Sequence, residues 1–222
     1  LGDVYKRQTI DSVICQTLSF AEHIRLILLD DASTDGSFAI CEQYQKQYPK
    51  QILVKHYDTN QGVSVLRNEG VRIAGEMGDE LITFLDSDDK LADDAMEKAK
   101  MYFESHEDIS VAAIAVKYFG TRDGEQRLNW RFQEMDVVDI KKQYTFPHYY
   151  VGGVFLRKRV LNELHFDETM NFWEDALAIN QVIVSEGKYG LIQDTFYFYR
   201  KREDESSLVD TCLLYTSDAA DD

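Results

Sequence analysis

Four short, nearly continuous apolar runs constrain the fold of this chain more than any other feature. They are "IRLILLD", "QILVKHY", "ELITFLD" and "ISVAAIAV", at residues 24–30, 51–57, 80–86 and 109–116. Apolar runs of this length are typical of parallel strands that are covered on both faces. Segments with apolar residues at helical spacing separate the runs, as at 63–77. This alternation predicts an α/β fold with a mostly parallel, doubly wound sheet and helices on both faces.

The alternation ends near residue 116. Beyond it, the sequence predicts a hairpin around Asp123-Gly124, a strand within "GGVFLRK", a helix that ends at Gly187, and two short strands, "YGLI" and "TFYFYRK". No internal repeat or low-complexity segment interrupts the chain. We therefore expect one domain with two halves, residues 9–116 and 117–211.

The composition fits a soluble globular protein, because apolar residues make up 44% of the 222. The net charge of −16 argues against a nucleic acid or an anionic membrane as partner. No apolar run approaches the ~18 residues of a membrane span. The three cysteines have no motif spacing, which favours a reducing compartment. We expect a cytoplasmic protein, with the inner face of the membrane as a second location.

Both ends of the chain look foreign to the rest. One DNA word, read in opposite orientations, encodes "DVYKRQ" near the start and "CLLYTS" near the end. That word resembles the transposon adaptor of sequencing libraries. We therefore predict that residues 1–8 and 212–222 are adaptor read-through, and we leave them out of the fold argument. On this interpretation the chain is a fragment, truncated at both ends.

Carboxylates follow two of the predicted strands. Asp30 and Asp31 end the first run, and Asp86, Asp88 and Asp89 follow the third. Because the carboxyl ends of parallel strands share one edge of a sheet, where ligands bind, we expect these acids to crowd together. Mg²⁺ binds through one or two carboxylates and completes its shell with water and phosphate oxygens. The bland alternative is that "DSDD" forms a turn and caps the next helix.

A calcium loop is a further alternative for the stretch that begins at Asp31. "DASTDGSFAICE" nearly fits the twelve-residue EF-hand pattern, with Gly36 sixth and Glu42 twelfth. An EF-hand needs a helix before the loop, whereas the apolar run before Asp31 favours a buried strand. Calcium binding is therefore kept as a minor alternative. The glycine-rich phosphate-binding signatures are absent from the sequence.

Five segments, taken together, resemble family 2 glycosyltransferases. They are "LILLDDASTDGS", "NQGVSVLRNEG", "ELITFLDSDD", "FWEDALAINQ" and "YFYRKREDESS", in the order that this family shows. The resemblance implies a GT-A fold and inverting transfer of a sugar from a nucleotide diphosphate to a hydroxyl group. It also implies a nucleotide-sugar-binding half at 9–116 and an acceptor-binding, catalytic half at 117–211. It is strongest to bacterial enzymes that decorate surface polysaccharide or teichoic-acid-like polymers.

The resemblance also implies roles for individual residues in the donor site. Asp31 would accept a hydrogen bond from the nucleotide base, usually uracil, and Arg67 would approach the diphosphate. Asp86 would lie near the ribose and the donor sugar. Asp88 would bind Mn²⁺ or Mg²⁺ at the diphosphate, where the charge of the ion stabilises the leaving group. Without the resemblance, Arg67 would be placed on a solvated helix face.

The same resemblance places the catalytic base at Asp175 of "WED". Inverting transfer requires a carboxylate that takes the proton from the attacking hydroxyl group. Glu174 is adjacent and is easily confused with Asp175, and either acid has the simpler role of complementing a helix dipole. Trp173 would support the acceptor as an aromatic platform, although a partly buried tryptophan is the commoner outcome.

One part of the family pattern is missing from this chain. Family members normally begin with a strand and a nucleotide-gripping loop, and here the sequence begins in the following helix. We therefore expect a sheet without its first strand and a fragment with impaired activity. The expected partners are a nucleotide-sugar donor and a glycan or polymer acceptor, with membrane contact only through missing segments. The alternatives are a nucleotidyltransferase acting on sugar phosphates and a non-catalytic calcium- or partner-binding module.

Overall fold

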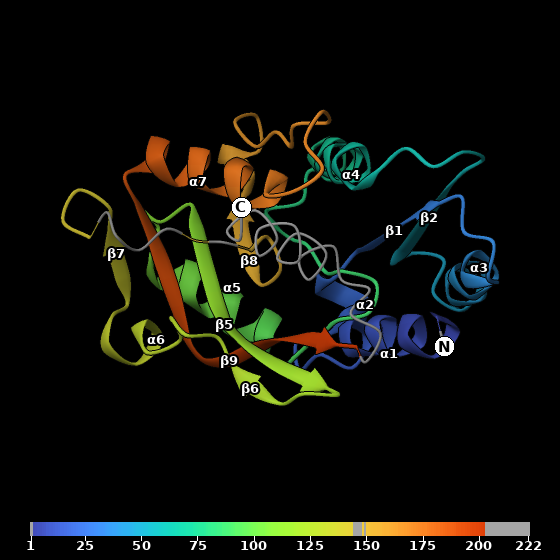
Figure 1. Cartoon of the computed structure of the whole chain (residues 1–222), viewed down its shortest axis with the longest axis horizontal. Helices are drawn as coiled ribbons and strands as arrows, with labels where there is room; N and C mark the ends of the chain where they lie inside the picture. The colour runs from blue at the N-terminus through green and yellow to red at the C-terminus, as the bar shows by residue number, and fades with distance from the viewer. Residues whose placement is uncertain (1, 144–147, 149, 203–222) are drawn as a thin grey trace, which may run out of the picture.

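The computed structural model describes residues 2–143, 148 and 150–202 (Figure 1). A seven-stranded sheet with the order β3-β8-β5-β9-β4 forms its centre, with β6 added to β5 and β7 added to β9. A separate two-stranded sheet, β1-β2, stands beside it. The strands are β1 (Leu26–Asp31), β2 (Ile52–Tyr57), β3 (Leu81–Thr83), β4 (Lys90–Leu91), β5 (Val111–Gly120), β6 (Gly124–Glu125), β7 (Val137–Asp139), β8 (Val154–Arg157) and β9 (Lys188–Lys201).

Helices connect most of these strands. They are α1 (Gly2–Ile14), α2 (Phe20–His23), α3 (Ser37–Gln47), α4 (Val63–Met77), α5 (Ala95–Ser105), α6 (Arg131–Glu134), α7 (Glu174–Glu186) and the 3-10 helix η1 (Lys158–Val160). Gly78 and Gly187, in the left-handed conformation, end α4 and α7, as glycine does most easily. In the described part of the chain, every helix falls short of the length and apolar character that a membrane crossing requires.

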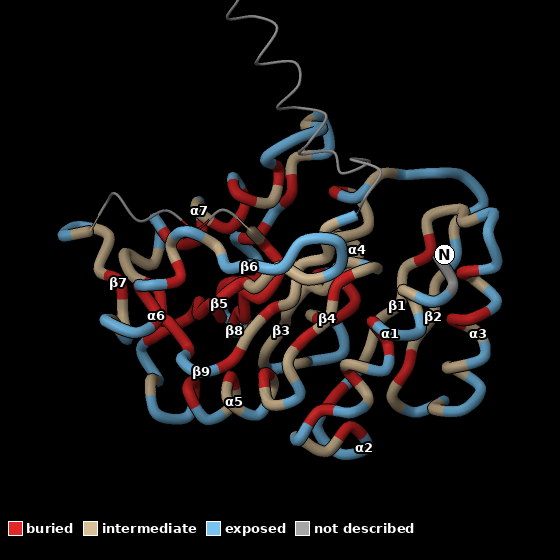
Figure 2. The backbone as a smooth tube through the Cα atoms, turned by 60° about the horizontal axis from the view of Figure 1, so that its bottom comes forward, coloured by how far each residue is buried: buried red, intermediate tan, exposed pale blue. Residues whose placement is uncertain are grey.

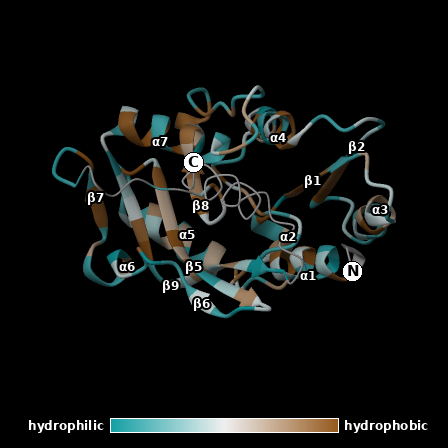
Figure 3. Ribbon diagram, viewed as in Figure 1, coloured by the Kyte–Doolittle hydropathy of each residue, from teal (hydrophilic) through white to brown (hydrophobic). Residues whose placement is uncertain are grey.

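Helices cover both faces of the larger sheet, as the sequence predicts. Alternate side chains of β5 point to opposite faces, so that one set packs with α7 and the other with α5. The first set is Val111, Ala113 and Ala115, and the second is Ala112, Ile114 and Val116. Figure 2 shows buried residues gathered along β5 and β8, and Figure 3 shows the hydrophobic character of β1 in the smaller sheet. The predicted α/β class is confirmed.

The prediction of a mostly parallel sheet is wrong in detail. The described strands pair in parallel at β1-β2 and β5-β9, whereas β3-β8, β5-β8, β5-β6, β7-β9 and β4-β9 are antiparallel. The apolar runs report that both faces are covered, and a mixed sheet between two layers of helices satisfies that condition equally well. Leu91 likewise belongs to β4, opposite Tyr197, rather than to the helix after it. The two short strands predicted at the end form the single strand β9.

The two sheets are not joined, since no described strand pairs β1 with β3. Residues 26–29 of β1 are apolar but only half-buried. Residues 2–8, predicted to be adaptor read-through, lie in the first turns of α1. The matching stretch 212–222 lies outside the described residues, and the adaptor origin of both stretches stays a prediction.

Candidate functional site

The acids at the end of β1 have separate surroundings. Asp30 is 2% exposed, and its Oδ2 accepts the Ser33 N–H at 3.2 Å and lies 2.8 Å from His56 Nδ1. Although burial raises the pKa of Asp30, these hydrogen bonds bring it below its usual range. Its Oδ1 is buried without a hydrogen-bond partner. An unpaired buried carboxylate oxygen is costly, and its burial leaves it no surface for a ligand, so Asp30 supports the loop that follows β1.

Asp31 holds a loop in place. Its carboxylate accepts the backbone N–H groups of Gln61, at 2.6 Å, and Gly62, at 3.0 Å, just before α4. Because β1 precedes Asp31 where an EF-hand would have a helix, the calcium-loop alternative is wrong. No cluster of three or more potential metal ligands occurs among the described residues. The predicted contact of Asp31 with the nucleotide base stays a prediction.

Arg67 connects Asp86, which follows β3 at the rim of the sheet predicted to bind the donor, with the start of α7. Its Nη1 lies 2.8 Å from Glu174 Oε1 and its Nη2 lies 3.3 Å from Asp86 Oδ1. The side chain of Arg67 is 11% exposed, and its guanidinium also stacks 5.5 Å from the centre of the Phe166 ring. Arg67 is therefore not on a solvated helix face. In this structure it neutralises buried Glu174 and half-exposed Asp86, and the predicted contact with a diphosphate would have to be made in addition.

The next residue on α4 fixes the loop that leads to α7. The Asn68 side chain donates to the Phe166 carbonyl and accepts the Phe166 N–H, both at 2.9 Å. Because the amide both donates to and accepts from the backbone of the same residue, Phe166 has little freedom to shift. Arg67 and Asn68 together position the α7 acids relative to Asp86. Sequence reasoning did not single out Asn68, although "LRN" lies within a quoted motif.

Glu174 and Asp175 have different partners at the N-terminal end of α7. Glu174 is buried and paired with Arg67. Among the described residues, the Asp175 oxygens accept only backbone N–H groups, that of Ala176 at 2.7 Å and that of Val151 at 3.4 Å. Burial raises the pKa of Asp175 against the opposing charge of Arg67. A raised pKa makes a carboxylate a better proton acceptor. Trp173 is 59% exposed, so the commoner outcome of a partly buried tryptophan does not apply.

Asp88 and Asp89 are also distinct. Asp88 Oδ2 accepts hydrogen bonds from Arg202 Nε, at 3.0 Å, and from its Nη2. Asp89 is 1% exposed and accepts the Tyr197 hydroxyl and the Arg200 N–H, each at 2.7 Å. Burial raises the pKa of Asp89 to about 8. Asp89 is therefore a structural acid, whereas Asp88 pairs with a cationic side chain, as Asp86 does with Arg67.

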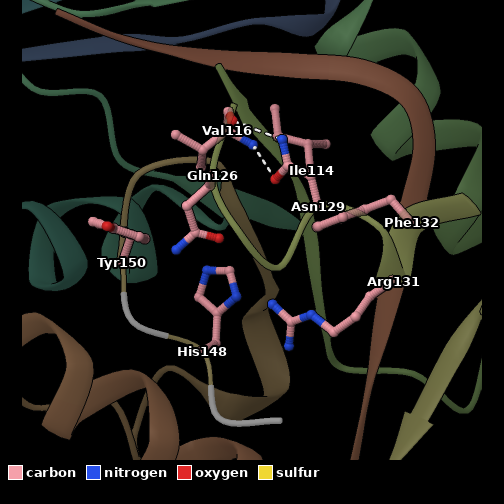
Figure 4. Close-up of a pocket in the computed structure, with 8 residues that line it drawn as sticks. All are labelled: Ile114, Val116, Gln126, Asn129, Arg131, Phe132, His148 and Tyr150. Carbon is pink, nitrogen blue, oxygen red and sulfur yellow. Dashed lines mark hydrogen bonds between the residues drawn. The ribbon is translucent and has the colours of Figure 1, made fainter. Parts of the chain in front are cut away.

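A pocket of about 220 Å³, open solvent included, lies beside β5 (Figure 4). His148 points into it towards Gln126 and Arg131, and both of its ring nitrogens are buried without a hydrogen-bond partner. Its backbone is held by Asn180 of α7, whose Oδ1 accepts the His148 N–H at 3.1 Å.

His148 makes the protein sensitive to acid. Burial, followed by the charge of Arg131, lowers the pKa of His148 to about 3 from its ordinary 6.5. Below pH 6.5 the unfolded chain therefore takes up a proton that the folded chain refuses, so stability is lost as the pH falls towards 3. From pH 6.5 to 5 we expect His148 to cost roughly 2 kcal/mol of unfolding free energy.

Urea unfolding at a series of pH values tests this expectation. His148→Gln should flatten the acid limb of the stability profile, while His165→Gln, at an exposed position, should leave it unchanged. Equal acid limbs in wild type and His148→Gln would show that the imidazole is not held neutral.

Comparison with known proteins identifies the family of this chain. Residues 5–165 match the family model described as "Glycosyl transferase family 2". The minor teichoic acid biosynthesis protein GgaA of Bacillus subtilis (strain 168) is 39% identical over 208 residues, which cover 93% of this chain and 46% of GgaA. The chain thus spans about half the length of this curated relative.

Solved structures agree with the fold. S. aureus TarS 1–349 has a TM-score of 0.73 at 21% identity, covering 90% of this chain and 57% of that one. The mannosyltransferase PcManGT from Pyrobaculum calidifontis, in complex with GDP-Man and Mn²⁺, has a TM-score of 0.68 at 14% identity, covering 92% and 56%. These similarities confirm the predicted GT-A-like fold. A family match over more than half of its length shows that the chain belongs to glycosyl transferase family 2, a family of enzymes, rather than to the nucleotidyltransferases.

Proposed function

We propose that this chain forms the donor-binding and transfer part of an inverting glycosyltransferase that uses a nucleotide-diphosphate sugar. The observation that carries the proposal is the bridge of Arg67, which connects Asp86 at the donor rim with Glu174, the neighbour of Asp175. The bridge brings a candidate donor-binding acid and a candidate base to one place. Family membership supports the reaction class.

The proposed base is Asp175, because among the described residues no cationic side chain is bound to its carboxylate, unlike that of Glu174. The N–H groups of Ala176 and Val151 orient its two oxygens. In an inverting step it would take the proton of the acceptor hydroxyl as that oxygen attacks the anomeric carbon from the side opposite the leaving group. Exposed Trp173, two residues earlier, would support the acceptor.

A divalent cation is part of the proposal. Asp88, with a side chain that is 21% exposed, and Asp86, at 44%, offer the one or two carboxylates that Mg²⁺ or Mn²⁺ takes when substrate phosphates complete its shell. Both Arg202 contacts are to Asp88 Oδ2, so a metal ion would bind through Oδ1 or take the place of the guanidinium. Bound there, the ion would stabilise the negative charge of the departing nucleotide diphosphate. PcManGT was solved with Mn²⁺, which is consistent with this assignment.

The proposed acceptor is a teichoic-acid-type polymer. This choice follows from the similarity to the minor teichoic acid biosynthesis protein GgaA, which is 39% identical. Such polymers consist of alditol or sugar units linked by phosphate, so a binding surface for them must accept repeated negative charge. The protein itself carries a net charge of −16, so local cations would have to offset its overall repulsion.

Binding of UDP with and without Mn²⁺, measured by isothermal titration calorimetry, tests the donor and metal roles. We expect Mn²⁺ to tighten UDP binding by about tenfold, or 1.4 kcal/mol, because the ion bridges Asp88 and the diphosphate. Asp88→Asn should remove this enhancement and keep the metal-free affinity. Asp123→Asn, in the exposed turn before β6, is the matched control. Full enhancement in Asp88→Asn would rule out its metal role, and tighter binding of GDP than UDP would change the donor.

A further inference from the structure

Three tyrosines and a lysine form a cluster at the far ends of β5 and β9, which lie side by side (Figure 1). Tyr118 of β5 is paired in register with Tyr199 of β9, and their ring centres lie 6.1 Å apart. Tyr150 lies 6.5 Å from Tyr199. Lys201 Nζ lies 5.3 Å from the Tyr118 ring centre and 5.0 Å from that of Tyr199. We call these four residues the tyrosine–lysine cluster.

Tyr150 is the member of the cluster that lies beside the proposed transfer site. Tyr150 precedes Val151, whose N–H donates to Asp175 Oδ2. It is two residues from Gly152, which forms a bridge with Phe84, and Phe84 is two residues before Asp86. Tyr150 also lines the pocket that contains His148 (Figure 4). These neighbours connect Tyr150 to the segment that contacts Asp175 and to the strand that leads to Asp86.

The cluster lies at the margin of the core, because Tyr118 and Tyr199 pack against the buried residues between β5 and α5 but stay partly exposed. All four side chains are only half-buried, and in the described part of the chain no carboxylate pairs with Lys201. Arg122, an exposed residue, is close enough to oppose the rise that burial causes in the pKa of Tyr118. Aromatic faces pack against the carbon skeleton of sugars and alditols, and ammonium groups bind phosphate. On a chain of −16 net charge, such a cationic aromatic surface stands out.

We propose that the tyrosine–lysine cluster is an acceptor subsite that takes an alditol phosphate unit. This assignment rests on the proposed transferase function, because the subsite supplies the hydroxyl group to Asp175. The ring faces of Tyr118, Tyr150 and Tyr199 bind the carbon skeleton. Lys201 binds the phosphate that links one unit to the next, and Arg122 adds a second positive charge at the margin. A neutral glycan would gain nothing from Lys201.

Direct binding tests the subsite without requiring turnover. Ribitol 5-phosphate is titrated into the protein and followed by calorimetry, with ribitol and inorganic phosphate as the two partial ligands. We expect ribitol 5-phosphate to bind at least about tenfold more tightly than either one, since the cluster contacts both of its parts. Equal affinities for ribitol and ribitol 5-phosphate would overturn the role of Lys201, and equal affinities for phosphate and ribitol 5-phosphate would overturn the role of the rings.

Variants of the cluster separate its two contributions. Lys201→Gln should reduce the affinity for ribitol 5-phosphate to that for ribitol, whereas Lys50→Gln, an equal change of charge at an exposed site beside β2, should have no effect. Tyr199→Leu should weaken both ligands, and Tyr199→Phe, which keeps the ring, should bind as wild type does. Unchanged binding in Lys201→Gln or Tyr199→Leu would refute the proposal. UDP affinity is measured on the same proteins. If the wild-type protein binds ribitol 5-phosphate but not UDP, the donor site is refuted and the subsite is not.

Discussion

Arg67→Ala should lower the free energy of unfolding by about 3–5 kcal/mol, the usual cost of removing one partner from a buried ion pair. Without the guanidinium, Glu174 would remain buried at 8% exposure with no counter-ion, and Asp86 and Asp175 would repel it. Urea unfolding followed by circular dichroism measures the loss. Arg72→Ala is the matched control, because Arg72 lies on the same helix and pairs at the surface with Glu69 and Glu76.

A second substitution separates charge from packing in this prediction. Adding Glu174→Gln to Arg67→Ala should restore part of the lost stability, since it removes the buried charge that the first change leaves unpaired. The double-mutant cycle therefore has a favourable coupling between Arg67 and Glu174. If Arg67→Ala unfolds no more easily than Arg72→Ala, the three carboxylates do not depend on Arg67, and its placement in the donor site would have to be reconsidered.

The sequence predicts the elements of this fold better than their pairing. The apolar runs that end at Asp30 and Tyr57 are β1 and β2, and Gly187 ends α7 as expected. These features depend on local chemistry, namely burial and backbone conformation. Strand direction depends on which distant segment lies alongside, and nothing within "ISVAAIAV" specifies that its neighbours are β8, antiparallel, and β9, parallel.

For the candidate site too, the sequence predicts the residues better than their contacts. Adjacent acids such as Glu174 and Asp175 look equivalent in the sequence, and only the reach of Arg67 from a helix 107 residues away distinguishes them. The same holds for Asp88 and Asp89, because Tyr197 buries the second and Arg202 faces the first. The tyrosine–lysine cluster is assembled from three separate segments. The parallel register of β5 and β9, which brings Tyr118 opposite Tyr199, has no local signature.

Asp175→Asn should reduce sugar transfer by about 10²–10⁴-fold, the usual contribution of a positioned general base. The substitution keeps nearly the same volume and one oxygen for the closer N–H group, that of Ala176 at 2.7 Å, and gives up only the 3.4 Å contact with the Val151 N–H, so UDP affinity should not change. Transfer is measured as acceptor-dependent UDP release, with UDP affinity determined on the same protein. Asp167→Asn, in the loop before α7 where the carboxylate accepts the N–H and hydroxyl of Thr169, is the matched control.

The pH dependence of transfer adds a signature that a purely structural role of Asp175 would lack. Because burial raises the pKa of Asp175, its carboxylate begins to protonate above the ordinary value of 3.8. The base works only when it is deprotonated, so the transfer rate should fall as the pH decreases through this raised pKa. The residual rate of Asp175→Asn should lack that acid limb. Normal turnover in Asp175→Asn, or an acid limb that survives the substitution, would assign the proton transfer to another group. Glu174 would be that group unless it stays paired with Arg67 in the donor complex.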